Sequence, residues 1–306
     1  MTSLENSNNI KNLVIEGGGI KGVAFVGAIK ALEEKDILAG INNFIGSSAG
    51  SFIAAFLAIR MPYKDIKNAI NGLDYTQIKD GHIFAILYNF IKNFGLYLGD
   101  YLITYTAGIL QKYTGNGNIT FKEVYDKYGN TLVITGTNIS KGLVEYFSYK
   151  NYPDMPIKTA MRISMSIPYF FEAVDFDGCT WVDGGVLDNY PFNYFQDSEH
   201  TLGLKLVNNN EKRDNTIYHY HKNIENIKDF SIYLIDAMTN QIDRLHVNNN
   251  YWKATITINT LGVGTTDFDI SNDKRKELMK EGYNSVINHF QQKYDEINTS
   301  VNQIAA

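Results

Sequence analysis

A serine flanked by two glycines is the first group in this sequence that could carry out chemistry. Residues 46–50 (GSSAG) fit the G-x-S-x-G pattern, with Ser48 at the centre. In a nucleophile elbow such a serine sits on a strained strand-to-helix turn, where any side chain in place of the flanking glycines would clash with the neighbouring strand and helix. The pattern is short enough to arise by chance, and Ser47 or Ser48 could instead cap a helix. The motif therefore indicates a nucleophile only together with its surroundings.

A glycine-rich turn precedes the serine. Residues 17–22 (GGGIKG) match the G-x-G-x-x-G spacing of a dinucleotide-binding loop, which expects the next strand to end in an acidic residue. Here that strand, residues 41–46, ends in the serine motif. A P-loop is excluded because Val and Ala, not Lys and Ser or Thr, follow the last glycine. We therefore expect the backbone N–H groups of Gly17, Gly18 and Gly19 to stabilise a developing oxyanion.

A serine nucleophile also needs a group that accepts its proton. No histidine lies in a glycine-flanked turn or at a conspicuous strand end; the six are His82, His200, His219, His221, His246 and His289. Asp183 is a better candidate, because it ends the short β-branched and aromatic run before Gly184 and Gly185, which permit a tight turn. The same pattern is typical of an Asx-turn at a hairpin, so this motif alone leaves both interpretations open.

The segments around the two glycine turns alternate between strand and helix patterns. Residues 13–18 predict a buried strand, and apolar residues at helical spacing from Val23 predict a helix. Residues 41–46 predict the next strand, and residues 51–60 predict an apolar helix that ends before Pro62. Such βαβα units form parallel sheets covered on both faces. We therefore expect an α/β fold, a three-layer sandwich with a central, mostly parallel sheet.

The later segments extend this sheet. Patterns predict a strand and its hairpin partner at 131–139 and 143–149, a short helix at 158–168 stopped by Pro168, further strands up to residue 207, a loop at 208–222, an amphipathic helix at 230–245, a strand at 254–258, and a last helix at 273–292 capped by Ser271. We expect one domain: residues 10–200 form its catalytic core, and residues 201–306 add helices to that core without forming a second domain.

Residues 82–110 are dense in apolar and aromatic side chains and are interrupted by Gly95, Gly99 and Asp100. The commoner interpretation of such a stripe is a pair of core helices. The alternative is a lid or interfacial cap over an acyl-binding pocket, with Ile83, Phe84 and Leu87 as candidate membrane-contacting residues.

Composition excludes several classes of protein. The 306 residues are 44% hydrophobic and 20% charged, which is typical of a globular chain, and the formal net charge of −5 argues against a nucleic-acid partner. The single cysteine, Cys179, excludes an internal disulfide and a thiolate metal cluster. No signal-peptide pattern or membrane-spanning stretch is present, so we expect a soluble cytoplasmic protein; export without a cleaved signal is also compatible with the sequence.

Taken together, the glycine loop, the serine motif and the Asp-Gly-Gly turn resemble the patatin-like phospholipase family. Residues 161–171 (MRISMSIPYFF), 182–192 (VDGGVLDNYPF) and 261–271 (LGVGTTDFDIS) are similar to segments of that family. The resemblance implies a Ser-Asp dyad without a histidine, metal or other cofactor. Its nucleophile is Ser48, its base is Asp183, its oxyanion hole is Gly17, Gly18 and Gly19, and its supporting glycines are Gly22, Gly46, Gly50, Gly184 and Gly185. The family often has arginine where this chain has Lys21, and a lysine cannot form the bidentate contacts that an arginine makes.

These observations predict a lipid acyl hydrolase of the phospholipase A or lysophospholipase type, which cleaves fatty-acyl esters of phospholipids or lysophospholipids. Because its substrate lies in a bilayer or micelle, we expect peripheral membrane contact. Three alternatives stay open: a Ser-Asp-His esterase for soluble substrates with His219, His221 or His246 as base, a catalytically silent lipid-binding module, and an enzyme that transfers the acyl group to an alcohol.

Overall fold

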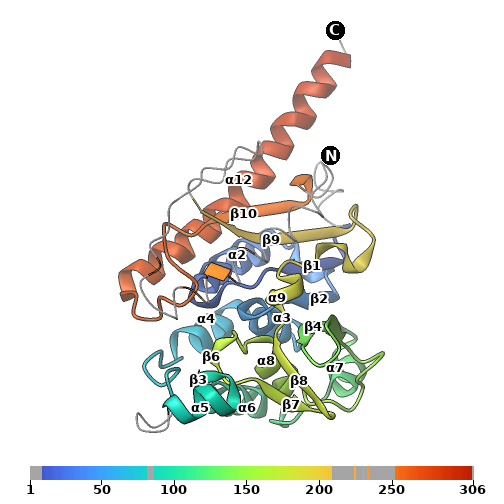
Figure 1. Cartoon of the computed structure of the whole chain (residues 1–306). Coiled ribbons are helices and arrows are strands. Elements are labelled where there is room, and N and C mark those ends of the chain that lie inside the picture. The colour runs from blue at the N-terminus through green and yellow to red at the C-terminus, as the bar shows by residue number, and fades with distance from the viewer. Residues whose placement is uncertain are drawn as a thin grey trace.

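The structure, a computed structural model, describes residues 9–80, 86–208 and 252–304, together with residues 224, 230, 233, 234 and 237. Its elements, shown in Figure 1, are β1 (Asn12–Ile15), η1 (Gly19–Gly22), α2 (Val23–Glu34), η2 (Leu38–Gly40), β2 (Asn43–Gly46), α3 (Ala49–Ala58), α4 (Tyr63–Asn71), α5 (Ile86–Asn93), β3 (Gly95–Tyr97), α6 (Asp100–Thr114), α7 (Phe121–Tyr128), β4 (Thr131–Asn138), β5 (Leu143–Phe147), α8 (Ile157–Ser164), β6 (Tyr169–Phe171), β7 (Val174–Phe176), β8 (Cys179–Asp183), α9 (Gly185–Asp188), η3 (Phe192–Phe195), β9 (Thr201–Val207), β10 (Thr255–Asn259) and α12 (Asn272–Ile304).

A central sheet organises the described part of the chain. Its strand order is β10-β9-β1-β2-β4-β8-β7, and β5 also pairs with β4. The run from β10 to β4 is parallel, whereas β5, β8 and β7 are antiparallel to their neighbours. The four residues of β1 are all buried, as expected for a parallel strand that is covered on both faces. The predicted α/β fold with a central, mostly parallel sheet is confirmed.

Each face of the sheet has its own apolar core. Alternate residues such as Leu13 and Ile15 join the larger core, to which α2, α3 and α8 contribute. The intervening Val14 belongs to a smaller cluster on the other face, packed with Tyr190 and Phe192 from the chain after α9. The long helix α12 packs along α2 and β10 (Figure 1). Helices and connecting segments thus hold the carboxyl ends of β1 and β2 in fixed positions.

Several predicted elements differ from the structure in their bounds. The last helix begins at Asn272, and Ser271 Oγ accepts the Lys274 backbone N–H as a cap, but the helix continues to Ile304 instead of ending at residue 292. Neither glycine nor proline follows residue 292 to stop it. Helix α8 ends at Ser164, before Pro168, because the chain turns there into β6. The predicted loop at 208–222 and helix at 230–245 lie almost entirely outside the described residues.

The segment 82–110 is buried in one part and exposed in another. Helix α6 buries Leu102, Thr106 and Leu110 in the core. In contrast, Ile91 of α5 and Phe94, which lies between α5 and β3, are 68% and 58% exposed. The candidate membrane residues Ile83 and Phe84 lie outside the described residues, and no side-chain description covers Leu87. No described helix is long and apolar enough to span a bilayer.

Candidate active site

Ser48 lies on a strained turn between β2 and α3. Its backbone angles are φ 46° and ψ −125°, a region that side-chain-bearing residues rarely occupy. A Cβ atom on Gly46 would overlap the backbone of Gly50, and one on Gly50 would overlap the carbonyl oxygen of Ile15. The two glycines therefore let β1, β2 and the start of α3 approach closely enough to hold this turn. The Ser48 residue itself is 6% exposed.

Sheet register brings Asp183 to the level of Ser48. Gly46 of β2 pairs with Ile134 of β4, and two residues further along β4, Gly136 pairs with Asp183 at the end of β8. Ser48 is likewise two residues beyond Gly46. Because β4 lies between β2 and β8, the serine and the aspartate come to the same edge of the sheet from either side of one strand.

The Asp183 carboxyl group is buried and only partly hydrogen-bonded. Its Oδ1 accepts the backbone N–H of Gly185 at 2.7 Å, while Oδ2 accepts no hydrogen bond from the described part of the chain. Burial raises the pKa of Asp183 to about 7; the Ser48 hydroxyl and the Gly185 N–H favour the charged form and oppose this rise. The Ser48 hydroxyl is thus near this carboxyl group, although no hydrogen bond of standard geometry joins it to Oδ2. Such bonds are often long before a substrate binds.

The glycine loop presents two unengaged N–H groups. The N–H of Gly17 donates to the Asn189 carbonyl oxygen at 3.0 Å, so it is already used. Among the described residues, the N–H groups of Gly18 and Gly19 have no acceptor. Gly19 adopts φ +55°, and a Cβ atom there would overlap the Thr265 carbonyl oxygen, so its backbone conformation requires glycine. These two donors, and not Gly17, are available to a negatively charged oxygen.

Two side chains join the predicted motifs to one another. The Thr135 hydroxyl donates to Ser47 Oγ at 2.8 Å, and its side chain fills the space that a Cβ atom on Gly184 would need. The Asn189 side-chain amide donates to the Gly17 carbonyl oxygen at 3.1 Å, and its Oδ1 occupies the space beside Gly185. The sequence-based prediction assigned neither residue to the site. Thr135 is an ordinary strand residue, and Asn189 lies four positions beyond Gly185, the last glycine of the Asp-Gly-Gly turn.

Two serines after Arg162 were also missed. Ser164 Oγ accepts the backbone N–H of Ser48 at 2.9 Å, and the Ser166 carbonyl oxygen accepts the backbone N–H of Asp183 at 2.9 Å. Both lie in the segment 161–171 that the sequence singles out, but only the fold brings that segment against the serine and the aspartate.

An apolar cavity of about 80 Å³ opens beside Ser48. Its walls come from the glycine loop, α3, α4 and the segment after it, α6, the segment around β6, and the turn before α12. The lining residues are Gly19, Ile20, Gly22, Val23, Ser48, Ala49, Phe52, Ile53, Ile70, Leu73, Tyr75, Ile78, Leu102, Met165, Ile167, Phe171 and Phe268. Apart from Ser48 and the Tyr75 hydroxyl, these walls offer only hydrocarbon side chains, sulfur and backbone, which suits an acyl chain.

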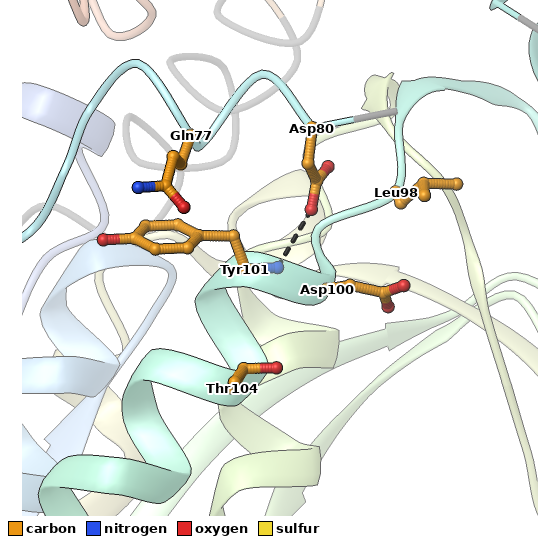
Figure 2. A pocket seen from close by; sticks show the side chains of 6 residues that line it. All are labelled: Gln77, Asp80, Leu98, Asp100, Tyr101 and Thr104. Atoms are coloured by element: carbon orange, nitrogen blue, oxygen red, sulfur yellow. Dashed lines mark hydrogen bonds between the residues drawn. The ribbon is translucent and has the colours of Figure 1, made fainter. Parts of the chain in front are cut away.

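A larger hollow of about 420 Å³ lies beside α6 and is open to solvent (Figure 2). Gln77, Asp80, Leu98, Asp100, Tyr101 and Thr104 line it. None of the residues predicted for the site contributes to this hollow. We therefore place the candidate site at the smaller cavity, where the strained serine and the buried carboxyl group meet.

Neither described histidine is arranged as a base for Ser48. His200 precedes β9, at the opposite end of the parallel strands from Ser48, and its Nδ1 pairs with Asp197 at 2.8 Å. His289 lies on α12, with its ring against Phe290. His82, His219, His221 and His246 lie outside the described residues. Within the described ranges, no group of three or more His, Cys, Asp or Glu side chains could hold a metal ion.

Comparison with known proteins identifies the family. A model of the family described as patatin-like phospholipase matches residues 13–195, which include both glycine turns and the aspartate. The chain belongs to the patatin-like phospholipase family. Membership supports a hydrolase that acts on lipids, as the sequence predicts.

Individual relatives agree with this assignment. An uncharacterised protein of Acanthamoeba polyphaga mimivirus is 30% identical over 92% of this chain and 94% of its own length. A probable lipid hydrolase of Invertebrate iridescent virus 6 is 30% identical over 60% of this chain and 62% of its own length. Among solved structures, VipD from Legionella pneumophila shares the patatin-like fold with a TM-score of 0.64 and 21% identity, over 93% of this chain and 67% of that one.

Proposed function

We propose that the protein is a lipid acyl hydrolase in which Ser48 attacks the ester carbonyl carbon and Asp183 accepts the serine proton. The observation that carries this proposal is the meeting of a strained, buried serine with a carboxyl group that has one oxygen without a hydrogen bond from the described residues. A pKa of about 7 for Asp183 means that both its charged and its neutral forms are populated near neutral pH. Asp183 can therefore accept a proton in one step and return it in the next.

The reaction would proceed in two halves. As the Ser48 oxygen bonds to the carbonyl carbon, Asp183 takes the proton, and the N–H groups of Gly18 and Gly19 stabilise the oxyanion together with the N-terminal end of α3. Collapse of this intermediate breaks the ester bond, and the leaving alcohol takes the proton from Asp183. Water then attacks the acyl-serine with Asp183 as base, which releases the fatty acid and restores Ser48.

Fewer glycines are available as oxyanion donors than the sequence predicts. Three glycines were candidates, but the Gly17 N–H donates to Asn189, so we assign the role to Gly18 and Gly19. Gly17 instead makes a close approach, because a Cβ atom there would meet Ser48 Cβ at 2.9 Å. A side chain at that position would displace the nucleophile.

The apolar lining of the cavity supports an acyl ester as the substrate. Its wall begins at Ser48 and Gly19 and continues over residues such as Phe52, Ile70 and Leu102, so an acyl chain bound there would bring its carbonyl group to the serine. Burial of each methylene group would contribute about 0.8 kcal/mol. We propose a phospholipid or lysophospholipid ester, of which these contacts would bind the acyl part.

Release of fatty acid from phospholipid vesicles tests this proposal. We expect Ser48→Ala to abolish release, while circular dichroism shows the same folded state as for the unaltered protein. A matched control is Ser148→Ala, which removes another buried serine whose hydroxyl contacts Asn151 instead of the site. Full activity of Ser48→Ala would contradict the proposal, and product profiles on phospholipid and lysophospholipid vesicles would separate the two enzyme types.

We further propose that an exposed apolar surface brings the protein to the lipid. This surface consists of Ile91, Phe94 and Tyr169, which are 68%, 58% and 43% exposed. Phe94 and Tyr169 are neighbours, because the Tyr169 backbone N–H donates to the Phe94 carbonyl oxygen at 3.2 Å, and Ile91 precedes Phe94 by three residues. This surface also adjoins the cavity, because Ile167 and Phe171, two residues either side of Tyr169, line the cavity wall.

Vesicle flotation tests this surface. We expect the double variant Ile91→Ser, Phe94→Ser to float less with neutral phospholipid vesicles and to retain hydrolysis of a water-soluble short-chain ester. A control is Ile139→Ser, which removes another exposed apolar side chain at the end of β4. Equal flotation of the double variant, the control and the unaltered protein would contradict the assignment.

A further inference from the structure

The connection after α8 holds both proposed catalytic residues by their backbones. Ser164 Oγ accepts the N–H of Ser48, and the Ser166 carbonyl oxygen accepts the N–H of Asp183, each at 2.9 Å. Only one residue separates these two acceptors. The relative placement of nucleophile and base therefore depends on the conformation of residues 164–166, which are not part of the proposed proton transfer.

Arg162 fixes that conformation from within the core. Arg162 is only 7% exposed, and its Nη1 donates to Ser166 Oγ. The same hydroxyl donates back to the Arg162 carbonyl oxygen at 2.7 Å, which closes the turn on itself. The guanidinium group also lies over the ring of Phe171, at 5.7 Å from its centroid, and Phe171 lines the cavity.

The other end of the guanidinium group reaches the cap segment, residues 95–104. Its Nη2 donates to the Leu98 carbonyl oxygen and, at 3.2 Å, to that of Glu172. A Cβ atom on Gly99 would lie 2.6 Å from the guanidinium carbon, so this glycine lets the backbone pass over the group. The cap segment carries Leu102, which forms part of the cavity wall.

Asp80 also holds the cap segment, through the backbone N–H groups of that segment. Its carboxylate accepts the backbone N–H groups of Gly99 at 2.7 Å and of Tyr101 at 2.9 Å, the second of which Figure 2 shows at the start of α6. Asp80 thus caps the helix, while Arg162 binds the carbonyl group just before it. The cap segment is therefore held in two ways: its N–H groups donate to Asp80, and its Leu98 carbonyl oxygen accepts from Arg162.

The partners of Arg162 are neutral. Among the described residues no carboxylate forms an ion pair with it, and its hydrogen bonds go to two carbonyl groups and a hydroxyl group. Burial lowers the pKa of Arg162, and the charges of Asp80, Asp100 and Glu172 oppose that shift. Because apolar residues often replace buried charges without loss of stability, stability alone does not account for this arginine. Its rigid fork of donors, however, suits acceptors that must be held in fixed relative positions.

We propose that Arg162 is a positioning residue that couples the cap segment to the Ser48–Asp183 pair. Through Leu98 it holds a wall of the cavity, and through Ser166 it holds the turn that binds both catalytic backbones. Loss of the guanidinium group releases the cap and misplaces the pair together. The role of Ser48 and Asp183 rests on the proposed function; the mechanical coupling through Arg162 does not.

Two variants of Arg162 separate the contribution of its positive charge from that of its forked hydrogen-bond donors. Arg162→Met keeps an apolar stem but removes all donors, and Arg162→Lys keeps the charge but removes the fork. The matched control is Arg60→Met, which removes an arginine that binds Asn130 Oδ1 at 2.7 Å after α3, away from the cap segment. Ser164→Ala removes only the acceptor of the Ser48 N–H.

Three measurements test the coupling. Hydrogen exchange measured on the whole 306-residue chain should rise in Arg162→Met in three segments together, residues 43–52, 95–104 and 180–186, and in none of them in Arg60→Met. The rate of covalent labelling of Ser48 by a fluorophosphonate should fall about tenfold or more, because small misplacements of reacting groups cost that much. Hydrolysis of a soluble ester should lose kcat with KM changed less than threefold, and Arg162→Lys should be intermediate.

The outcomes distinguish the two proposals. If exchange in Arg162→Met rises only in residues 160–172, or if labelling stays within twofold of Arg60→Met, Arg162 has no positioning role. If Ser48 of the unaltered protein is not labelled at all, the proposed function fails, and exchange still decides the coupling. If Arg162→Met does not fold, Arg162→Lys and Ser164→Ala carry the test: both should slow labelling, and only Arg162→Lys should raise exchange in residues 95–104.

Discussion

Two buried carboxyl groups at the same edge of the sheet, Glu16 and Asp183, have opposite surroundings. Each residue is 4% exposed. Glu16 Oε1 accepts a hydrogen bond from Lys205 Nζ and Oε2 accepts one from the Leu206 backbone N–H, both at 2.5 Å. Asp183 has one backbone donor, on Oδ1, and Oδ2 has none among the described residues. A carboxylate with both oxygens engaged holds structure, whereas one with a free oxygen can exchange a proton.

The position of Glu16 explains what it holds. It directly precedes the glycine loop, and Leu206, whose N–H it accepts, packs in the space above Gly18 that a Cβ atom would need. The ion pair with Lys205 therefore fixes the end of β9 against the proposed oxyanion donors. Asp183 faces the serine instead. The comparison predicts that replacing Asp183 lowers activity. It also predicts that replacing Lys205, the partner of Glu16, lowers stability.

The largest effect should come from Asp183→Asn. Asparagine has nearly the same shape but cannot accept the serine proton, so we expect fatty-acid release to fall about 1000-fold, equivalent to about 4 kcal/mol of the barrier. The free energy of unfolding at pH 7, measured with urea, should not fall, because the variant removes a buried carboxyl group that lacks a full set of partners. Asp175→Asn, on the neighbouring exposed strand β7, is the control and should keep its activity. If the Asp183→Asn variant stayed active but lost stability, Asp183 would have a structural role and not the proposed catalytic one.

A smaller effect, on stability, is expected from Lys205→Met. The variant leaves the Glu16 carboxylate buried without its cation, and breaking a buried pair in this way costs about 3 kcal/mol or more of the free energy of unfolding. Lys79→Met, which removes the more exposed pair with Asp269, should cost less than about 1 kcal/mol. Urea titrations of both variants measure this difference. Equal losses would show that the buried pair has no special structural role.

The smallest effect, per pH unit, concerns protonation of Asp183. Because burial raises its pKa to about 7, activity should rise about tenfold per unit up to pH 7 and then level off. Stability should change in the opposite direction. The folded state binds this proton more tightly than the unfolded state, so the contribution is complete below pH 3.8 and is lost as pH rises toward 7.

A comparison with Asp183→Asn isolates this contribution. Between pH 4 and pH 7, the free energy of unfolding of the unaltered protein should fall relative to that of the variant by about 1.4 kcal/mol per unit. Parallel pH curves for the two proteins would show that Asp183 titrates as in the unfolded chain.

The sequence was sufficient for those parts of the site that depend on local geometry. Glycine is required wherever the backbone must turn sharply or pass close to another segment. Gly46, Gly50 and Gly19 could therefore be recognised from the sequence without a structure. Strand patterns predicted the parallel sheet for a similar reason, because β1 and β2 are buried on both faces. That residues 10–200 and 201–306 form one domain stays a proposal.

The remaining parts depend on contacts between distant segments. Ser164 and Ser166 resemble many helix-end serines, and their bonds to Ser48 and Asp183 follow from the packing of α8 against β4 and β8. Exclusion of Gly17 as an oxyanion donor likewise depends on Asn189, 172 positions away. The length of α12 could not be predicted because no residue near position 292 is a strong stop signal.

The most direct test of the central claim, that Ser48 is the nucleophile and Asp183 its base, is mass-spectrometric mapping of a fluorophosphonate adduct on the full chain. We predict one adduct, on Ser48, absent in Ser48→Ala, retained in Ser47→Ala, and formed at least about 100-fold more slowly in Asp183→Asn. An adduct on any other residue, or equal labelling rates for Asp183→Asn and the unaltered protein, would contradict it.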